Sequence, residues 1–187
     1  MASNPAPGNL ELVRSFVNTW DAAVHSEALD SPAGLAQWLA GEGLLAEEAP
    51  PATDDDLRHA VALREALRAT LMAHAGLELD PAAAGELDAA AKRARLTVRF
   101  AADVTPRTEP LAPGVAGALG WLLAIVATSV QDGAWPRLKV CLAEDCQWAY
   151  YDNSRNRSSV WCDMRVCGNR QKVRSYRERH RHPSAAT

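Results

Sequence analysis

The sequence lacks an apolar run long enough to cross a bilayer. Its longest such run, residues 117–130, is shorter than the about 20 residues that a transmembrane helix needs and is typical of a buried core helix. Residues 1–9 lack the basic start, apolar centre and cleavage site of a secretory signal. We therefore expect no membrane segment, a flexible tail at residues 1–9 and a cytoplasmic protein.

Catalytic motifs are missing as well. The chain has no phosphate-binding loop, dinucleotide fingerprint or nucleophile elbow, and no internal repeat. His25, His59 and His74 stand alone on expected helices, where an ordinary surface or core histidine explains each of them. We expect a protein that is not an enzyme.

Positive charge is scarce over most of the chain and concentrated at its end. Residues 1–136 hold 9 Lys+Arg against 18 Asp+Glu, a net charge of -9, whereas residues 137–187 hold 11 against 5, a net charge of +6. The composition, 48% hydrophobic and 23% charged, suits a globular protein with one moderate domain and a smaller second one. The asymmetry indicates an anionic partner for the C-terminal part.

Apolar residues recur at helical spacing through the first 136 residues. The series Leu10, Val17 and Val24 predicts an amphipathic helix over residues 10–25, and residues 114–131 form the most apolar helix. The alternation in residues 96–100 predicts a short, half-buried strand whose partner stays unassigned. The tryptophans at core-like positions are Trp20, Trp38 and Trp121.

Helix starts are marked by capping residues. Ser31 before a proline, Thr53 with Asp56 as a capping box, and Asp80 before a proline each predict a helix N-terminus. Composition changes near Pro136, where we place a domain boundary.

Every cysteine lies within a short C-terminal segment. Cys141 and Cys146 are separated by four residues, as are Cys162 and Cys167, and fifteen residues lie between the pairs. Two thiol pairs joined by a loop are what a tetrahedral zinc site needs, and four thiolates leave no open position for catalysis. Disulfides, an iron–sulfur cluster and unlinked core cysteines are the alternatives; one structural zinc is the preferred interpretation.

A basic helix is expected directly after the second thiol pair. Gly168 permits a close turn at the metal, Asn169 caps the helix, and Val173, Tyr176 and His180 are expected to rest against the zinc site. This layout is that of a treble-clef finger. The aromatic residues expected to pack around the metal are Trp148, Tyr150, Tyr151 and Trp161.

The C-terminal segment closely resembles the CGNR zinc finger, named for the residues that stand here as Cys167, Gly168, Asn169 and Arg170. The stretches LKVC, WAYYDNSRNRS, WCDMRVCGNR and KVRSYRER extend the resemblance. In that family the finger follows a helical ABATE domain, described as a stress-induced transcription regulator. The stretches FVNTWD and LREALRATL of this chain resemble the weaker signatures of that domain. The expected fold is mainly α: a helical ABATE-like domain with a short β element at 10–136, then a small treble-clef-like finger with a basic C-terminal helix at 137–182, and a flexible tail at 183–187.

The resemblance implies that Cys141, Cys146, Cys162 and Cys167 bind one structural zinc ion and that the finger binds DNA. The residues expected to contact DNA are Arg155, Arg157, Arg170, Lys172, Arg174, Arg177, Arg179 and Arg181. This chain departs from the family at Ser159 and Val160, where members commonly carry two arginines.

The preferred hypothesis is a zinc-dependent, DNA-binding transcription regulator responding to stress or another signal. Its N-terminal domain would receive a small-molecule or protein signal, or form a homodimer. The alternatives are a zinc-stabilised protein-interaction module, a thiolate redox sensor, and RNA binding without a recognisable RNA motif.

Overall fold

The helices begin where the sequence places capping residues. In the computed structural model, which describes residues 5–181, the Ser31 hydroxyl accepts a hydrogen bond from the Gly34 N–H at 3.0 Å. Thr53 and Asp56 form the expected capping box, and Asp80 caps the helix after it. All three predicted helix starts are therefore confirmed.

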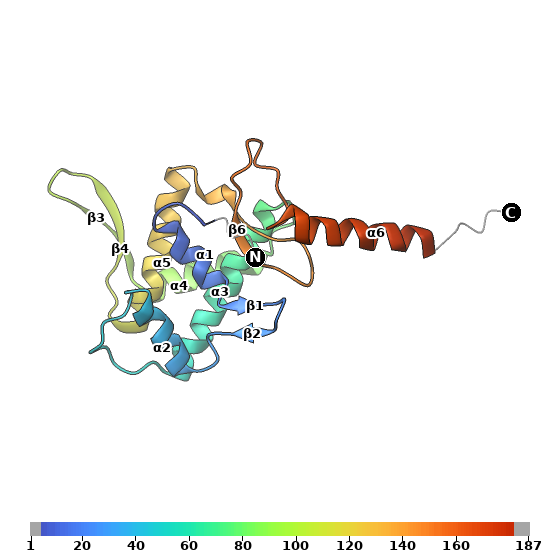
Figure 1. Ribbon diagram of the computed structural model, residues 1–187. Coiled ribbons are helices and arrows are strands. Elements are labelled where there is room, and N and C mark those ends of the chain that lie inside the picture. The colour runs from blue at the N-terminus through green and yellow to red at the C-terminus, as the bar shows by residue number, and fades with distance from the viewer. Residues whose placement is uncertain (1–4, 182–187) are drawn as a thin grey trace.

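Six helices and three two-stranded antiparallel sheets make up the part of the chain that is described (Figure 1), so the mainly α prediction is confirmed. The helices are α1 (Leu10–Val17), α2 (Pro32–Gly41), α3 (Asp54–His74), α4 (Pro81–Arg93), α5 (Gly114–Gln131) and α6 (Asn169–Arg181). The strand pairs are β1 (Trp20–Asp21) with β2 (Ser26–Glu27), β3 (Leu96–Phe100) with β4 (Pro106–Pro110), and β5 (Leu138–Val140) with β6 (Ala149–Tyr151). Two single turns complete the list, η1 (Trp135–Arg137) and a π-helical turn η2 (Met164–Gly168).

The predicted helix over residues 10–25 is wrong in its second half. The helix α1 ends at Val17, and the chain turns into the β1–β2 hairpin, where Val24 is exposed. The Thr19 hydroxyl donates to the Phe16 carbonyl, and the Asn18 amide bonds to the backbone of Ala149 far along the chain. These polar side chains compete with the helical hydrogen bonds and stop the helix.

The main hydrophobic core lies between α1, α2, α3 and α5, and the strands β5 and β6 belong to it. Its largest fully buried side chains on the helices are Phe16, Leu35, Leu39, Leu63, Leu67, Leu71 and Leu122. Leu138 and Val140 of β5 and Ala149 and Tyr151 of β6 belong to the same cluster. The hydrophobic core therefore continues past Pro136 into the cysteine-containing segment.

The three tryptophans predicted at core-like positions differ in burial. Trp38 packs against the core, with its ring centroid 5.3 Å from that of Phe16, and Trp20 is half-buried. Trp121 is 43% exposed, so its assignment to the core is wrong. It lies on α5, whose opposite side supplies the buried Leu119, Leu122 and Leu123, and a helix has only one side facing the core.

The helix α5 is long and apolar enough to span a membrane by length and composition alone, and half of its residues are buried inside the fold. It packs against α1, α4 and β4. A side-chain carbon at Gly120 would lie 2.7 Å from Pro110, so glycine permits the close approach of β4. In this fold α5 serves as a core helix.

The predicted strand at residues 96–100 is present as β3, and its partner is β4. The hairpin extends away from the helices (Figure 1), and only its base meets α5. Leu96 at the base is half-buried, but Val98 is exposed and Phe100 is 67% exposed. The expected half-burial is therefore wrong beyond Leu96.

His74, at the end of α3, yields a prediction about pH. Its Nδ1 lies 2.9 Å from the Leu138 carbonyl, its ring packs edge-on against Trp135, and burial lowers the pKa of His74, with a smaller lowering by Lys139. The folded pKa lies below the unfolded value, so the neutral ring's contribution is complete above the unfolded pKa of about 6.5 and is lost as pH falls below it. Urea unfolding at a series of pH values should show a smaller loss of stability in acid for His74→Gln than for the wild type. The same dependence of stability on pH in both proteins would contradict this prediction.

Candidate metal centre and nucleic-acid interface

The four cysteines converge from three separate segments. The turn between β5 and β6 carries Cys141 and Cys146, the loop after β6 carries Cys162, and η2 carries Cys167. All four are buried, and their Sγ atoms lie within 4.8 Å of one another, with 3.6 Å from Cys162 to Cys146 and to Cys167. Four sulfurs around zinc at about 2.3 Å stand about 3.8 Å apart, so this donor set fits one tetrahedral ion. The four cysteines are thus the binding site of one structural zinc ion.

Crowding of the thiols sets their protonation. Hydrogen bonds from Cys146 and Cys162 lower the pKa of Cys141, while the same contact with Cys141 raises the pKa of Cys146. Contact with Cys141 and Cys146 also raises the pKa of Cys162. Without a cation the cluster therefore favours a single thiolate, and a divalent ion is needed to hold all four in the charged form.

Aromatic side chains surround the site, largely as predicted. Tyr150 is 2% exposed and belongs to the cysteine cluster, and Trp148 and Trp161 pack against it. Tyr151 belongs instead to the main core, because neighbouring residues of a strand point to opposite faces. The strand β6 therefore joins the metal site to the helical core.

A buried ion pair that the sequence analysis missed lies beside the metal site. Lys139 and Asp152 are 2.8 Å apart, and both are almost fully buried. The same Lys139 Nζ donates to the carbonyls of Arg157 at 2.6 Å and Ser159 at 3.1 Å. Burial alone would raise the pKa of Asp152, but hydrogen bonds from Lys139 and Ser154 outweigh it and lower that pKa. A lysine inside an otherwise apolar strand was the available signal.

Ser159 and Val160, the departures from the family pattern, serve the fold of this loop. The Ser159 N–H donates to Asp152 at 3.0 Å, and its carbonyl accepts the Tyr150 hydroxyl at 2.7 Å. Its own hydroxyl donates to the Trp161 carbonyl at 3.0 Å, and the Val160 carbonyl accepts the Leu142 N–H. The Ser159 side chain is thus engaged with the chain itself.

The metal site is fastened to the helical domain by three side chains. Asn18 donates to the Ala149 carbonyl at 2.9 Å and accepts its N–H at 2.7 Å, pairing with β6 as another strand would. Arg68 donates to the carbonyl of Gln147 at 2.9 Å and to that of Val17 at 2.6 Å. His74 contacts Leu138, as described above. Gln147, next to the ligand Cys146, has a left-handed backbone with φ of 50°, and Arg68 holds its carbonyl.

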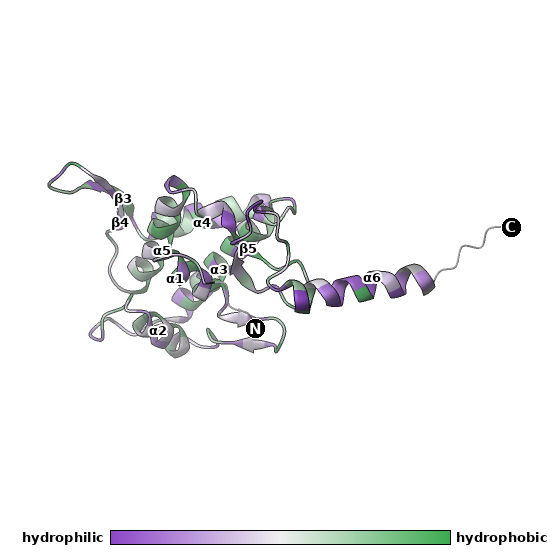
Figure 2. Ribbon diagram, turned by 45° about the horizontal axis from the view of Figure 1, so that its top comes forward, coloured by the Kyte–Doolittle hydropathy of each residue, from purple (hydrophilic) through white to green (hydrophobic). Residues whose placement is uncertain are grey.

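The helix α6 starts at the metal site and projects away from the body (Figures 1 and 2). The expected packing of its apolar residues on the zinc site is wrong. Val173 is exposed, Tyr176 is 57% exposed, and His180 stacks on Tyr176 with ring centroids 4.0 Å apart. Tyr150, Trp148 and Trp161 pack on the cysteine cluster instead, beside the knuckle, which is the turn between β5 and β6 that carries Cys141 and Cys146.

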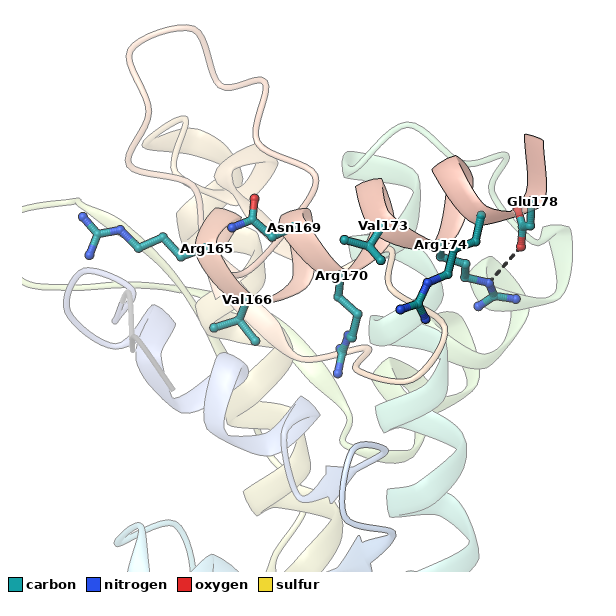
Figure 3. A pocket seen from close by; sticks show the side chains of 8 residues that line it. Arg165, Val166, Asn169, Arg170, Val173, Arg174 and Glu178 are labelled. Carbon is teal, nitrogen blue, oxygen red and sulfur yellow. Dashed lines mark hydrogen bonds and ion pairs between the residues drawn. The ribbon is translucent and has the colours of Figure 1, made fainter. Parts of the chain in front are cut away.

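Six of the eight residues predicted to contact DNA fall into two groups. Arg170 and Arg174 bind carboxylates of the knuckle, Asp145 at 3.0 Å and Glu144 at 2.8 Å. Figure 3 shows them in a shallow hollow along α6 with Val173. The exposed residues Arg155, Arg157, Lys172 and Arg177 make up the second group. Arg179 and Arg181 lie on α6, but their side chains fall outside the description, as do His182 and the expected tail at 183–187.

Arg165 is a cation of this surface that the sequence analysis missed. It is exposed and lines the same hollow, beside Val166 (Figure 3). Its position between Cys162 and the helix, in a stretch otherwise assigned to the zinc ligands, was the only signal.

The buried ion pair gives a stability prediction. Lys139→Met should destabilise the protein by about 3–5 kcal/mol, because it leaves Asp152 charged and buried without its partner. The double variant with Asp152→Asn should recover a part of this loss. Urea unfolding of the zinc-loaded protein measures both, and equal stabilities of wild type and Lys139→Met would contradict the assignment.

Two family models match the chain, one on each side of residue 136. Residues 137–180 match the CGNR zinc finger, and residues 10–132 match ABATE, "Putative stress-induced transcription regulator". A search of curated proteins gave no match. The two matches cover the helical domain and the cysteine site in the expected order. The chain belongs to the ABATE family and carries a C-terminal CGNR zinc finger.

Proposed function

We propose that this protein is a zinc-dependent, DNA-binding transcription regulator. The observation that carries the proposal is the position of α6: a basic helix begins at a zinc ligand and extends into solvent (Figure 1). A helix that is polar on nearly all sides and unsupported by the fold gains stability from a partner. The width of one helix suits the major groove of duplex DNA.

Charge supports an anionic partner. The segment 137–187 has a net charge of +6 and residues 1–136 have a net charge of -9, so the excess of positive charge lies in the C-terminal segment. Clustered arginines release counterions when they meet phosphates, which makes binding strongly dependent on salt. The family description of ABATE supports a role in transcription.

We propose a purely structural role for the zinc. Four thiolates close its coordination shell and leave no position for a substrate, so no enzymatic activity is proposed. The zinc would fix the direction of α6 by holding Cys167, which lies two residues before the helix begins.

For the helical domain we propose the receipt of a signal, and for the whole protein a cytoplasmic location. Arg68, Asn18 and His74 join this domain to the strands of the metal site. A ligand, a protein partner or a second copy that changed α3 would act on the finger through these contacts.

A protein partner is the second candidate, because α6 also exposes apolar side chains. The side chains of Val173 and Tyr176 are exposed to solvent, as is that of Val166 just before the helix. An acidic protein surface would meet the same arginines, and such a complex would show no preference among DNA sequences.

The test is binding of the zinc-loaded, full-length protein to duplex DNA at a series of salt concentrations. Affinity should fall steeply with salt, and Arg177→Glu should weaken binding by about tenfold and lower the salt slope by about 1. Arg107→Glu on the β3–β4 hairpin, far from α6 in Figure 1, is the matched control with the same charge change.

Removal of the metal is the second arm of this test. Cys162→Ser should lose bound zinc, DNA binding in solution and occupancy of defined genomic sites together. Binding that does not change with salt, or that Arg107→Glu weakens as much as Arg177→Glu, would refute the proposal. Purification with an acidic protein in place of DNA would favour the second candidate.

A further inference from the structure

Ion pairs orient the guanidinium groups of Arg170 and Arg174. Arg174 Nη1 donates to Glu144 at 2.8 Å, and its Nε donates to Glu178 at 3.2 Å. Arg170 Nη2 lies 3.0 Å from Asp145 and 3.5 Å from the Cys167 sulfur. Arg174 thus has one contact on the knuckle and one on α6 itself, whereas both contacts of Arg170 lie at the metal site. About half of each side-chain surface stays exposed.

The carboxylates make this pair a poor site for phosphate. Two guanidinium groups stand among three carboxylates, Glu144, Asp145 and Glu178, so the local charge favours no anion. By contrast, among the described residues no carboxylate is bound to the exposed side chains of Arg155, Arg157, Lys172 or Arg177. A phosphate contact needs positive charge but no fixed direction, and these four residues supply it.

A fixed direction matters for a different kind of contact. The edge of guanine in the major groove offers two acceptors, O6 and N7, and an arginine reads them with two parallel N–H groups. Parallel N–H groups lie on the Nη1–Nη2 edge or the Nε–Nη2 edge of a guanidinium. The ion pairs leave Arg174 its Nη2 and the second N–H of Nη1, which share an edge. Nη2 of Arg170 already contacts Asp145 and Cys167, so Arg170 keeps Nη1 and Nε and can donate one hydrogen bond to guanine. An arginine that is already oriented loses less conformational freedom when it binds than a free one does. The two residues stand one helical turn apart on the same side of α6, in one hollow (Figure 3). Arg165 and Arg177 line this hollow too, so the carboxylate partners are what distinguish Arg170 and Arg174.

We propose that Arg170 and Arg174 read guanine in the major groove, and that Asp145 and Glu144 position them for this. This inference rests on the proposed DNA binding and divides the predicted contacts into two classes. Arg170 and Arg174 set sequence preference, whereas Arg155, Arg157, Lys172 and Arg177 supply affinity that is the same for every sequence.

The experiment uses full-length, zinc-loaded protein and two duplexes. One is selected from a random library by the wild type, and the other is its scrambled form of equal length and composition. The variants are Arg174→Ala, the double change Glu144→Gln with Asp145→Asn, and Arg177→Ala. The matched control for charge is Glu78→Gln with Asp132→Asn, two exposed acids that contact no arginine in the described part of the chain. Zinc content and helical ellipticity show that each variant is folded.

The readout is the ratio of affinities for the selected and the scrambled duplex. Arg174→Ala and the double carboxylate variant should lower this ratio by about tenfold, while Arg177→Ala weakens both duplexes equally and leaves the ratio unchanged. Replacing guanine by 7-deazaguanine in the selected duplex removes N7, and at one position it should weaken the wild type but not Arg174→Ala.

Each contrary result has a distinct meaning. If the double carboxylate variant binds both duplexes more tightly by the same factor, the carboxylates only mask the arginines and the inference is overturned. The inference also fails, with DNA binding intact, if the wild type binds the selected and scrambled duplexes equally. If the wild type binds neither duplex, the proposed function itself fails and the inference with it.

Discussion

Repulsion among four crowded thiolates is the constraint on which the C-terminal quarter of this protein depends. The sulfurs are brought within 4.8 Å of one another, a distance at which they cannot all carry charge without a cation between them. One zinc ion meets that requirement and joins the knuckle, the loop and the start of α6. In the proposed function the metal sets the direction of the basic helix, because Val173 and Tyr176 of α6 are exposed and do not pack on the body.

Two buried cations stabilise the backbone around the metal site. Lys139 and Arg68 each hold a carbonyl of a residue in the left-handed conformation, Arg157 with φ of 52° and Gln147 with φ of 50°. Such backbone conformations are costly for residues with side chains, and they persist only where the surroundings hold them. One cation comes from the finger and the other from α3, so the shape of the knuckle belongs to both parts of the chain.

Local signals in the sequence predicted local features well. Ser31, Thr53 and Asp80 mark helix starts because a cap needs only its next few residues, and the cysteine spacing predicts a metal site because the two pairs are short. The end of α1 was missed because Asn18 binds Ala149, a contact that joins residues 131 positions apart. The exposure of Tyr176 was missed for a similar reason: helical spacing shows which residues share a side, but not whether anything covers that side. The division of the arginines into paired and unpaired was equally invisible, since it depends on where Glu144 and Asp145 come to lie.

The shared core has a consequence for how this architecture evolves. Leu138, Val140, Ala149 and Tyr151 lie between the ligand-bearing knuckle and the helices, and both sides lose their cover if the chain is divided near Pro136. A gene rearrangement that moved the finger alone onto another protein would carry an uncovered apolar strip with it. Selection therefore favours inheritance of the two segments together. A finger whose strands pack only on its own metal site could be transferred alone.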